Sequence, residues 1–544
     1  MNQKGLAPIA GLFIIIAAAL ALAFVGFPGQ SPIIPDQQPS GNLDDPLVPD
    51  KIVYFSSAQE IVDAFNQNQN GSMTGNGGMI PLSADARDSS TTSGKSESAS
   101  SPAPSGGSDY STTNNQVVGV DEPDIVKTDG TYIYAFYKNK IVITQAVPAA
   151  DAHIIATINL DNVTPHEMFV NGNHLLVFGN QYSNGEGGIY TKMAVMPGGI
   201  APDYYPYWGY SSAIVHEYDI SDKANPKLEK ELQFRGNYIA ARMIENKVYF
   251  VMTTYPDYRV LSGDDREYSD NDVIPPYIED GVEKPLANAR EIGYIPPMYA
   301  QQFVTLVSLD LDSREINKQT IVGSAETVYA SENAIYLSHT QWNYGYGWPM
   351  PMIGVAVDAV APTTTTSSPV ADSQPDVVDG SDVKPTSIVA PEPAMMDNRT
   401  YTIIHKFDLN DGEIDYVGKG KVLGHVLNQF SMDEFDNHFR IATTTDAQWD
   451  NFGKEQTLQM NNVFVLDDEM ETVGILEDLA PGERIYSARF MGERAYLVTF
   501  KQVDPLFVID LSQPTNPHVL GKLKIPGYSN YLHPIDDTHL IGIG

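Results

Sequence analysis

The chain has 544 residues, no cysteine and a formal net charge of −36 at pH 7. The lack of cysteine excludes disulfides and thiolate metal sites. The negative charge would repel a phosphate backbone, which excludes sequence-independent nucleic-acid binding. The composition, with 30 Tyr, 43 Gly, 37 Pro and only 19% charged residues, favours short strands and turns. We therefore predict an all-β protein.

The N-terminal residues 6–27 carry no charge and follow Lys4. About 20 apolar residues suffice to cross a bilayer as a helix, so we predict a signal anchor over residues 1–28. The positive-inside rule then places the rest outside, as a single-pass cell-membrane protein with an extracytoplasmic domain. Cleavage at the small residues near Ala23 would instead make the protein secreted. The opening also resembles archaeal pilin-like precursors, although no charged residue follows Gly5.

Residues 29–116 are predicted to be an extracytoplasmic linker. One short helix is expected over residues 57–66, because Ser57 and Glu60 have the spacing of a capping box and Ile61 and Phe65 share one face. Residues 71–116 are rich in Ser, Gly and Thr, with too few apolar side chains to offset the entropy of ordering. We expect a disordered stalk there.

A repeat begins after residue 116. A polar turn followed at once by a short apolar strand recurs seven times, starting at residues 129, 172, 245, 332, 436, 492 and 537. A second apolar strand follows each of the first six copies and usually ends in an aspartate, as at Asp219, Asp310, Asp408, Asp467 and Asp510. We interpret these aspartates as turn caps rather than catalytic groups.

This pattern predicts a β-propeller of four-stranded antiparallel blades over residues 117–544. A blade takes roughly 40–45 residues, so the longer intervals between copies are blades with insertions. About seven repeats are visible, and the last one is incomplete.

Three stretches carry a resemblance to a known family: VVGVDEPDIVKTDGTYIYAFYKNKIVI at 117–143, FSSAQEIVDAF before the stalk, and YSARFMGERAYLVTF at 486–500. They resemble archaeal and bacterial secreted or membrane-anchored proteins with a C-terminal β-propeller domain distantly related to WD repeats. The resemblance implies fold and location, and the family has no settled activity. Its members continue beyond the LHPIDDTHLIGIG motif, so we expect an open ring, either as a fragment or completed by a partner or an N-terminal strand.

Four insertions lie between the second and third strands of consecutive blades, at 180–212, 254–301, 342–399 and 446–461. Because strands alternate in direction, these loops should share one face of the propeller. Two loops contain aromatic clusters that could stack on a ligand, with Tyr207, Trp208, Trp342 and Trp348 as anchors. The alternative is that these side chains only pack their own loops. Residues 360–398 are expected to form a disordered and O-glycosylated insertion.

Further candidate site residues are scattered along the chain. Arg242 and Arg489 occupy equivalent places in YIAARM and IYSARF, where they would line the channel and bind an anion or pair with a neighbouring carboxylate. Glycosylation sequons begin at Asn70, Asn162 and Asn398. The acidic loop at 263–273 could hold Ca²⁺, but a solvated charge cluster is the preferred interpretation.

No catalytic motif or metal site is found: there is no HExxH, no Walker loop and no dinucleotide fingerprint. We therefore predict no catalytic residue and no cofactor other than the Ca²⁺ alternative. The predicted function is an extracytoplasmic cell-surface binding or scaffold module for a surface glycan or protein. The alternative is an extracytoplasmic enzyme, a glycan hydrolase or a quinone-dependent dehydrogenase, that uses the propeller channel. The sequence leaves the ligand and the oligomeric state open.

Overall fold

The computed structural model describes most of the repeat region and parts of the N-terminus. The described residues are 14–16, 52–73, 113, 115–182, 193–196, 199–202, 211–256, 267–295, 298, 300, 302–342, 399–449, 455–500, 504–525, 527, 529–536 and 538–544. The chain divides into two compact units, residues 1–341 with 399–544 and residues 342–398. All elements below belong to the first unit, apart from the last residue of β22.

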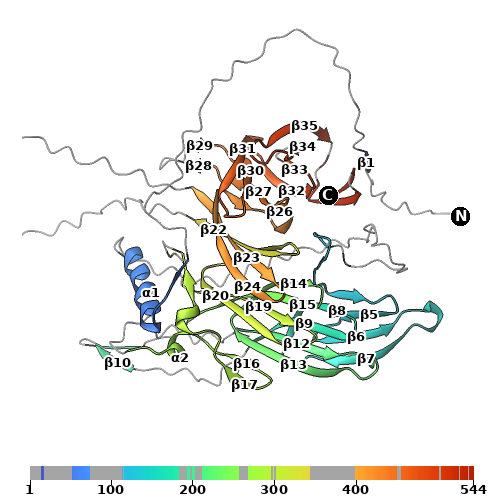
Figure 1. Cartoon of the computed structure of the whole chain (residues 1–544), viewed down its shortest axis with the longest axis vertical. Coiled ribbons are helices and arrows are strands. Elements are labelled where there is room, and N and C mark those ends of the chain that lie inside the picture. The colour runs from blue at the N-terminus through green and yellow to red at the C-terminus, as the bar shows by residue number, and fades with distance from the viewer. Residues whose placement is uncertain are drawn as a thin grey trace, which may run out of the picture. The chain divides into compact units, whose positions relative to one another are not determined.

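Six antiparallel sheets of four principal strands follow one another along the chain (Figure 1). We call them blades 1 to 6. Blade 1 consists of β4 (Val126–Thr128), β5 (Tyr132–Phe136), β6 (Lys140–Gln145) and β7 (His153–Asn159). Blade 2 consists of β8 (Thr164–Asn171), β9 (His174–Tyr182), β12 (Ser211–Asp219) and β13 (Lys227–Arg235). Blade 3 consists of β14 (Asn237–Ile244), β15 (Lys247–Thr254), β19 (Phe303–Asp310) and β20 (Ile316–Val322).

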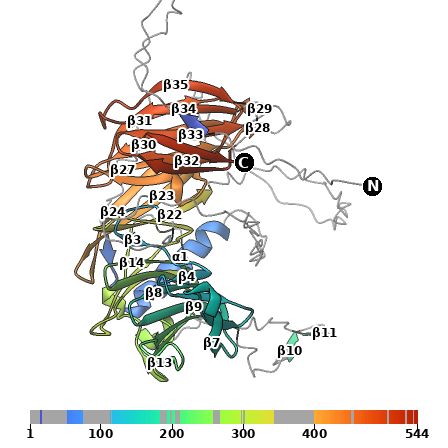
Figure 2. The same ribbon diagram turned by 90° about the vertical axis from the view of Figure 1, so that its right-hand side faces the viewer.

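The next three blades repeat this order, and Figure 2 shows blades 5 and 6 side by side. Blade 4 consists of β21 (Thr327–Ala330), β22 (Ala334–Trp342), β23 (Thr400–Asn410) and β24 (Glu413–Leu423). Blade 5 consists of β26 (Met432–Phe435), β27 (His438–Thr445), β30 (Met460–Leu466) and β31 (Thr472–Leu479), with the short β25 (His425–Val426) also on β27. Blade 6 consists of β32 (Arg484–Met491), β33 (Arg494–Phe500), β34 (Asp504–Asp510) and β35 (His518–Ile525).

The second strands of blades 2 to 6 are buried on both faces, which explains their continuous apolar runs. In β9, for example, Leu175, Leu176, Val177 and Phe178 are all buried, because each blade packs against a neighbour on either side. The prediction of an all-β chain with four-stranded antiparallel sheets is therefore confirmed.

The aspartates at the strand ends cap turns, as predicted. Asp219 accepts a hydrogen bond from the backbone N–H of Ser221 at 2.8 Å, and Asp310, Asp467 and Asp510 each accept from backbone N–H groups two or more residues further on. Asp408 differs, because it lies 3.7 Å from the Lys406 ammonium.

The predicted transmembrane helix is wrong. Within residues 6–27 the structure describes only β1 (Ile14–Ile16), a strand that pairs antiparallel with β37 (His539–Ile543). No described helix is long and apolar enough to cross a membrane, which also overturns the predicted membrane localisation. The β-branched isoleucines suit a strand, and the edge of β37 offers them unpaired backbone groups. The cleavage site near Ala23 lies outside the described residues.

The seventh sheet differs from the six blades. It contains β36 (Tyr531–Asp536), β37 and β1, so its third strand comes from the other end of the sequence. None of the described sheets closes on itself.

The helix α1 (Ala58–Met73) is part of the core of this unit. It buries Ile61, Val62 and Phe65 in the same cluster as side chains of blades 2 and 3. The preceding β2 (Val53–Tyr54) pairs with β18 (Gly293–Tyr294), which extends the sheet of blade 3. At the start of the helix, Ser57 accepts from the N–H of Glu60, whereas the Glu60 carboxylate accepts from Ser56.

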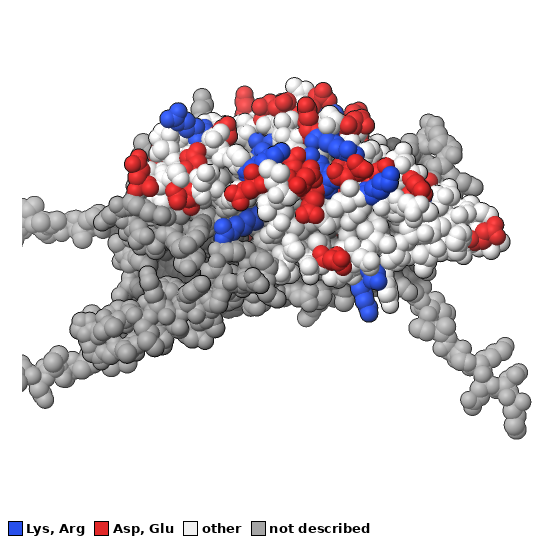
Figure 3. Space-filling model, turned by 90° about the horizontal axis from the view of Figure 1, so that it is seen from below, with Lys and Arg blue, Asp and Glu red and all other residues white. Residues whose placement is uncertain are grey.

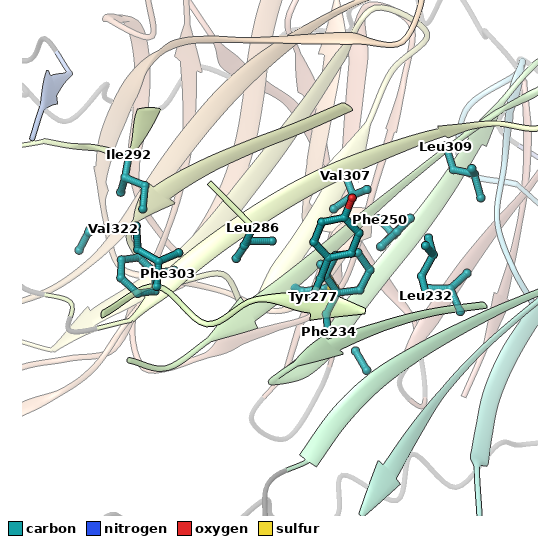
Figure 4. Packing of buried hydrophobic residues seen from close by; sticks show 14 of the residues in the cluster. Leu232, Phe234, Phe250, Tyr277, Leu286, Ile292, Phe303, Val307, Leu309 and Val322 are labelled. Carbon is teal, nitrogen blue, oxygen red and sulfur yellow. The ribbon is translucent and has the colours of Figure 1, made fainter. Parts of the chain in front are cut away.

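The described part of the blade 3 insertion folds against the same cluster. It contains α2 (Asp270–Val273), β16 (Tyr277–Glu279), β17 (Val282–Lys284) and η3 (Ala289–Glu291). Strand β16 pairs with β13, so an insertion of blade 3 extends the sheet of blade 2. Tyr277 stacks on Phe234 with ring centroids 5.1 Å apart (Figure 4). Such stacking adds about 0.5–1.5 kcal/mol to the area buried.

The remaining elements are short. They are β3 (Val120–Asp121), η1 (Ala149–Asp151), β10 (Met193–Met196), β11 (Gly199–Pro202), η4 (Gln429–Ser431), β28 (Gln448–Trp449) and β29 (Glu455–Thr457).

Candidate functional site

The segment before blade 1 runs along the first strands of other blades. Its β3 pairs with β14, the first strand of blade 3. In the same segment, the Gln116 side chain donates hydrogen bonds to the backbone oxygens of Gln429 at 3.1 Å and Met432 at 2.9 Å, at the first strand of blade 5. The segment therefore connects blades 3 and 5, which are not adjacent in sequence.

Polar side chains from these first strands gather around the segment. We call them the inner cluster, and they come from the segment itself, from blades 2, 3, 5 and 6, and from η4: Glu122, Glu167, Arg242, Gln429, Asp433 and Arg489. Sequence reasoning identified only the two arginines among them.

The Arg242 guanidinium donates three hydrogen bonds. It donates to the backbone oxygens of Ala241 at 2.7 Å and Val328 at 3.1 Å, and to Gln429 Oε1 at 2.6 Å. Its Nε lies 4.0 Å from Glu122 Oε1, while Glu122 Oε2 accepts from Gln429 Nε2 at 3.1 Å. The hydrogen bonds of Arg242 therefore go to backbone and amide oxygens, and Glu122 is a carboxylate nearby.

Arg489 has equal burial and different surroundings. It is 5% exposed, as is Arg242. Its guanidinium lies over the Phe430 ring, 5.2 Å from the centroid. Within the described part of the chain, nothing accepts a hydrogen bond from its Nη1, which is buried. Burial lowers the pKa of Arg489, because the charged form loses its hydration.

Two carboxyl groups of the inner cluster, those of Glu167 and Asp433, are partly buried. Burial raises the pKa of Glu167, and the negative charges of Glu122 and Asp124 raise it further. The Glu167 carboxyl group also accepts a hydrogen bond from the Tyr238 hydroxyl. Burial also raises the pKa of Asp433, opposed by the Arg440 guanidinium that is bonded to it. A raised pKa favours the neutral acid, which can donate a proton.

The sequence missed four of these residues for identifiable reasons. Gln429 belongs to η4, which interrupts the position of a first strand, and Asp433 follows it directly. Glu122 lies before the first repeat motif, and Glu167 stands in a strand with no catalytic spacing. The run VVGVDEP, which continues the chain into blade 1, was the signal that could have drawn attention to Glu122.

The other predicted site residues are not brought together by the described structure. Tyr207, Trp208, Trp348 and Asn398 lie outside the described residues. Trp342 is the last residue of β22, and its side chain is also outside them, as is that of Asn70 in α1. Asn162 is exposed, in the turn between β7 and β8, with φ of 62°.

The four insertions do leave from equivalent positions. In blades 2 to 5 they connect the second strand to the third: β9 to β12, β15 to β19, β22 to β23 and β27 to β30. Since strand direction alternates within each sheet, these connections emerge at the same end of their blades.

Surface charge gives no further site. The described part of the acidic loop caps α2, where Asp272 accepts from the N–H of Ser269 at 2.9 Å. The described residues contain no group of three His, Cys, Asp or Glu that could hold a metal ion. On the face shown in Figure 3, acidic and basic side chains are interspersed.

Comparison with known proteins identifies relatives in archaea. An uncharacterized protein of Methanocaldococcus jannaschii is 30% identical over 479 residues, which cover 80% of this chain and 65% of the relative. An uncharacterized protein of Archaeoglobus fulgidus is 28% identical over 480 residues, covering 80% and 67%. The chain therefore spans about two thirds of the length of these curated relatives.

Among solved structures, a mutant of the Synechocystis apocarotenoid oxygenase aligns with a TM-score of 0.28 and 11% identity, over 74% of this chain and 71% of that one. This likeness is too low to support an argument about function. A family model, described as the beta propeller domain, matches residues 110–544. The predicted relation to secreted proteins and to WD repeats is not tested by these matches. The chain belongs to the β-propeller domain family.

Proposed function

We propose that this propeller is a binding or scaffold module that recognises a glycan or a protein at the end carrying its four insertions. The observation that supports this is the repeated position of the insertions, between the second and third strands of four consecutive blades. Loops on a rigid scaffold are common carriers of recognition. The aromatic residues Tyr207, Trp208, Trp342 and Trp348 belong to two of these insertions, and we propose them as the anchors of the ligand.

The inner cluster supports a scaffold role. Gln116 bonds to Met432 of blade 5, β3 pairs with blade 3, and Arg242 bonds to residues of blades 3 and 4 and of η4. These bonds fix the blades relative to one another. A fixed platform lowers the entropy cost of presenting several loops together.

The test replaces all four aromatic residues by Ala in the full chain. Binding to arrayed glycans and arrayed proteins should be lost, with little change in the thermal unfolding midpoint. Phe435→Ala is the matched control, because Phe435 is an exposed aromatic residue at the end of the first strand of blade 5, next to the turn at the opposite end. A large loss of stability with unchanged binding would show that the four side chains only pack their own loops.

A second candidate is a glycan hydrolase, favoured by one observation. Glu167 is a partly buried acid whose pKa is raised by burial and by the negative charges of Glu122 and Asp124, and glycoside hydrolysis needs one carboxylic acid and one carboxylate. Hydrolysis of arrayed glycans that Glu167→Gln abolishes would support this candidate. Unchanged glycans would leave the binding module as the function.

A further inference from the structure

The Arg489 guanidinium is a buried cation, and among the described residues no carboxylate is hydrogen-bonded to it. Charges in protein interiors are paired or coordinated, because transfer out of water is otherwise very costly. Glu122 and Asp433 are the two carboxylates whose charges affect the pKa of Arg489. Both accept hydrogen bonds from other residues. Gln429 donates to Glu122, and Arg440 donates to Asp433 through Nε at 2.9 Å.

The surroundings of Arg489 form a defined junction. Strand β32, which carries Arg489, packs against η4 and against β36. Phe430 of η4 covers one face of the guanidinium, and its ring meets Tyr531 of β36 edge to face at 5.5 Å. A cation–π contact offsets part of the lost hydration, but it supplies no acceptor for the Nη1 hydrogens.

A second orphaned donor lies in the same junction. Ser431, the last residue of η4, is fully buried, and no described atom is a hydrogen-bond partner of its hydroxyl. A buried polar group without a partner generally has a water molecule or an ion as its missing partner. The Arg489 Nη1 in β32 and the Ser431 hydroxyl in η4 therefore each need a hydrogen-bond acceptor that the described residues do not provide.

We propose that Arg489 anchors an anion-binding site at the junction of η4, β32 and β36, with Ser431 as a second donor. The ligand is a small monovalent anion, a halide or the carboxylate of a small acid. A water molecule could accept one hydrogen bond, but only an anion also balances the guanidinium charge. The burial of Arg489 and Ser431 limits the size of the ligand. This site is separate from the insertions and from the proposed recognition of a glycan or protein.

The lowered pKa of Arg489 supports the same conclusion. It reflects a charged form that is poorly solvated in the protein alone, so an anion beside it would be stabilised strongly. The ionisable group of Tyr329 also affects the pKa of Arg489, and the Glu434 carboxylate affects that of Asp433. The Tyr336 hydroxyl is hydrogen-bonded to Glu434.

The experiment measures the thermal unfolding midpoint of the full chain in sodium bromide, sodium formate and sodium gluconate at equal ionic strength. We expect a saturable rise with bromide or formate and none with the larger gluconate. The bromide and formate arms distinguish a halide site from a carboxylate site. Arg489→Gln should lose the response, whereas Arg484→Gln, which changes an exposed arginine of the same strand that bonds Tyr486, should keep it.

A response in Arg489→Gln equal to that of the unmodified chain, or no response in the unmodified chain, would overturn the proposal. If Arg489→Gln fails to fold, crystals of the unmodified chain soaked in bromide decide the question. Anomalous density for bromide within hydrogen-bonding distance of Nη1 supports the site, and a water molecule alone there refutes it. Ser431→Ala should weaken the apparent affinity about tenfold, since a hydrogen bond to a charged group is lost.

Discussion

Arg242 in blade 3 and Arg489 in blade 6 occupy equivalent positions and are equally buried, yet their surroundings differ. Arg242 donates hydrogen bonds to blades 3 and 4 and to η4, and Arg489 lies against one aromatic ring. The repeat therefore fixes where an arginine stands in its strand, while the neighbouring segments decide what it does. At Arg242 the segment before blade 1 supplies Glu122, and at Arg489 no described segment supplies an equivalent acceptor.

Removal of each arginine should give the largest difference between the two positions. Arg242→Met leaves Gln429 Oε1 and the Val328 carbonyl without their donor and removes the positive charge near Glu122. Breaking a buried charged network in this way costs about 3–5 kcal/mol. Arg489→Met removes an unpaired charge and keeps the apolar contact with Phe430. In gluconate buffer it should therefore change the free energy of unfolding by less than about 1 kcal/mol or raise it.

Urea denaturation of the two variants measures this difference. A greater loss of stability in Arg489→Met than in Arg242→Met would contradict the contrast drawn from their contacts. Arg242→Lys is the control for charge alone, because lysine cannot reproduce the forked set of donors.

Two histidines of blade 4 differ in their polar contacts, and the His339 ring is hydrogen-bonded to the backbone of Ser324. His405 lies 3.2 Å from the Tyr416 hydroxyl, whereas no described partner is found for the buried Nδ1 of His339. Burial lowers the pKa of His339 to about 4 and that of His405 to about 3. The unfolded chain takes up these protons near pH 6.5, so the stabilising effect is complete above that value and is lost as the pH falls toward 4 and 3.

The expected loss is on the order of 2–3 kcal/mol for each histidine between pH 6.5 and 4. Urea unfolding at several pH values measures it, and His405→Gln should flatten the curve over this interval. His518→Gln is the control, because His518 is an exposed histidine. An equal change in both variants would show that the buried pair is not the cause.

The sequence predicted the blades well because their determinants are local. A polar turn, an apolar second strand and a third strand ending in a capping aspartate can each be read within about ten residues, as at Asp219 and Asp310. The inner cluster could not be read in the same way. Gln116, Arg242 and Gln429 lie hundreds of residues apart, and only the arrangement of the blades brings them together.

The structure of the N-terminal segment could not be predicted from its local sequence. A run of apolar residues is equally compatible with a membrane helix and with a buried or edge strand, and length alone favoured the helix. Pairing of Ile14–Ile16 with β37 depends on an edge that lies more than 500 residues away.

The contacts of Gln116 test whether the segment before blade 1 ties the blades together. Gln116→Ala removes two hydrogen bonds to backbone oxygens at the first strand of blade 5. The expected cost of losing both bonds is about 1–3 kcal/mol, at the usual 0.5–1.5 kcal/mol for each bond. Hydrogen exchange should become faster in blade 5, whereas Gln448→Ala, in the exposed hairpin that joins β27 to β30, should leave it unchanged. Unchanged exchange in Gln116→Ala would show that the segment lies against blade 5 without stabilising it.

The smallest expected effect concerns Glu167, whose surroundings resemble those of Arg489 in lacking an opposite charge bonded to it. Burial raises its pKa above the ordinary value near 4.5, so the stability that it contributes is present below that pH and is lost as the pH rises through the raised pKa. Glu167→Gln keeps an oxygen that accepts from Tyr238 and removes the titration. The free energy of unfolding of the variant should match that of the unmodified chain at pH 4 and exceed it by about 1 kcal/mol at pH 8, as measured by urea unfolding.

Tyr238→Phe serves as the matched control for Glu167→Gln, because it removes the hydrogen bond and leaves the carboxyl group. A variant that is less stable at pH 8 than the unmodified chain would mean that the Glu167 carboxylate is ionised in the native state and attracted by Arg242, and that the inner cluster holds one more charge pair than its hydrogen bonds reveal.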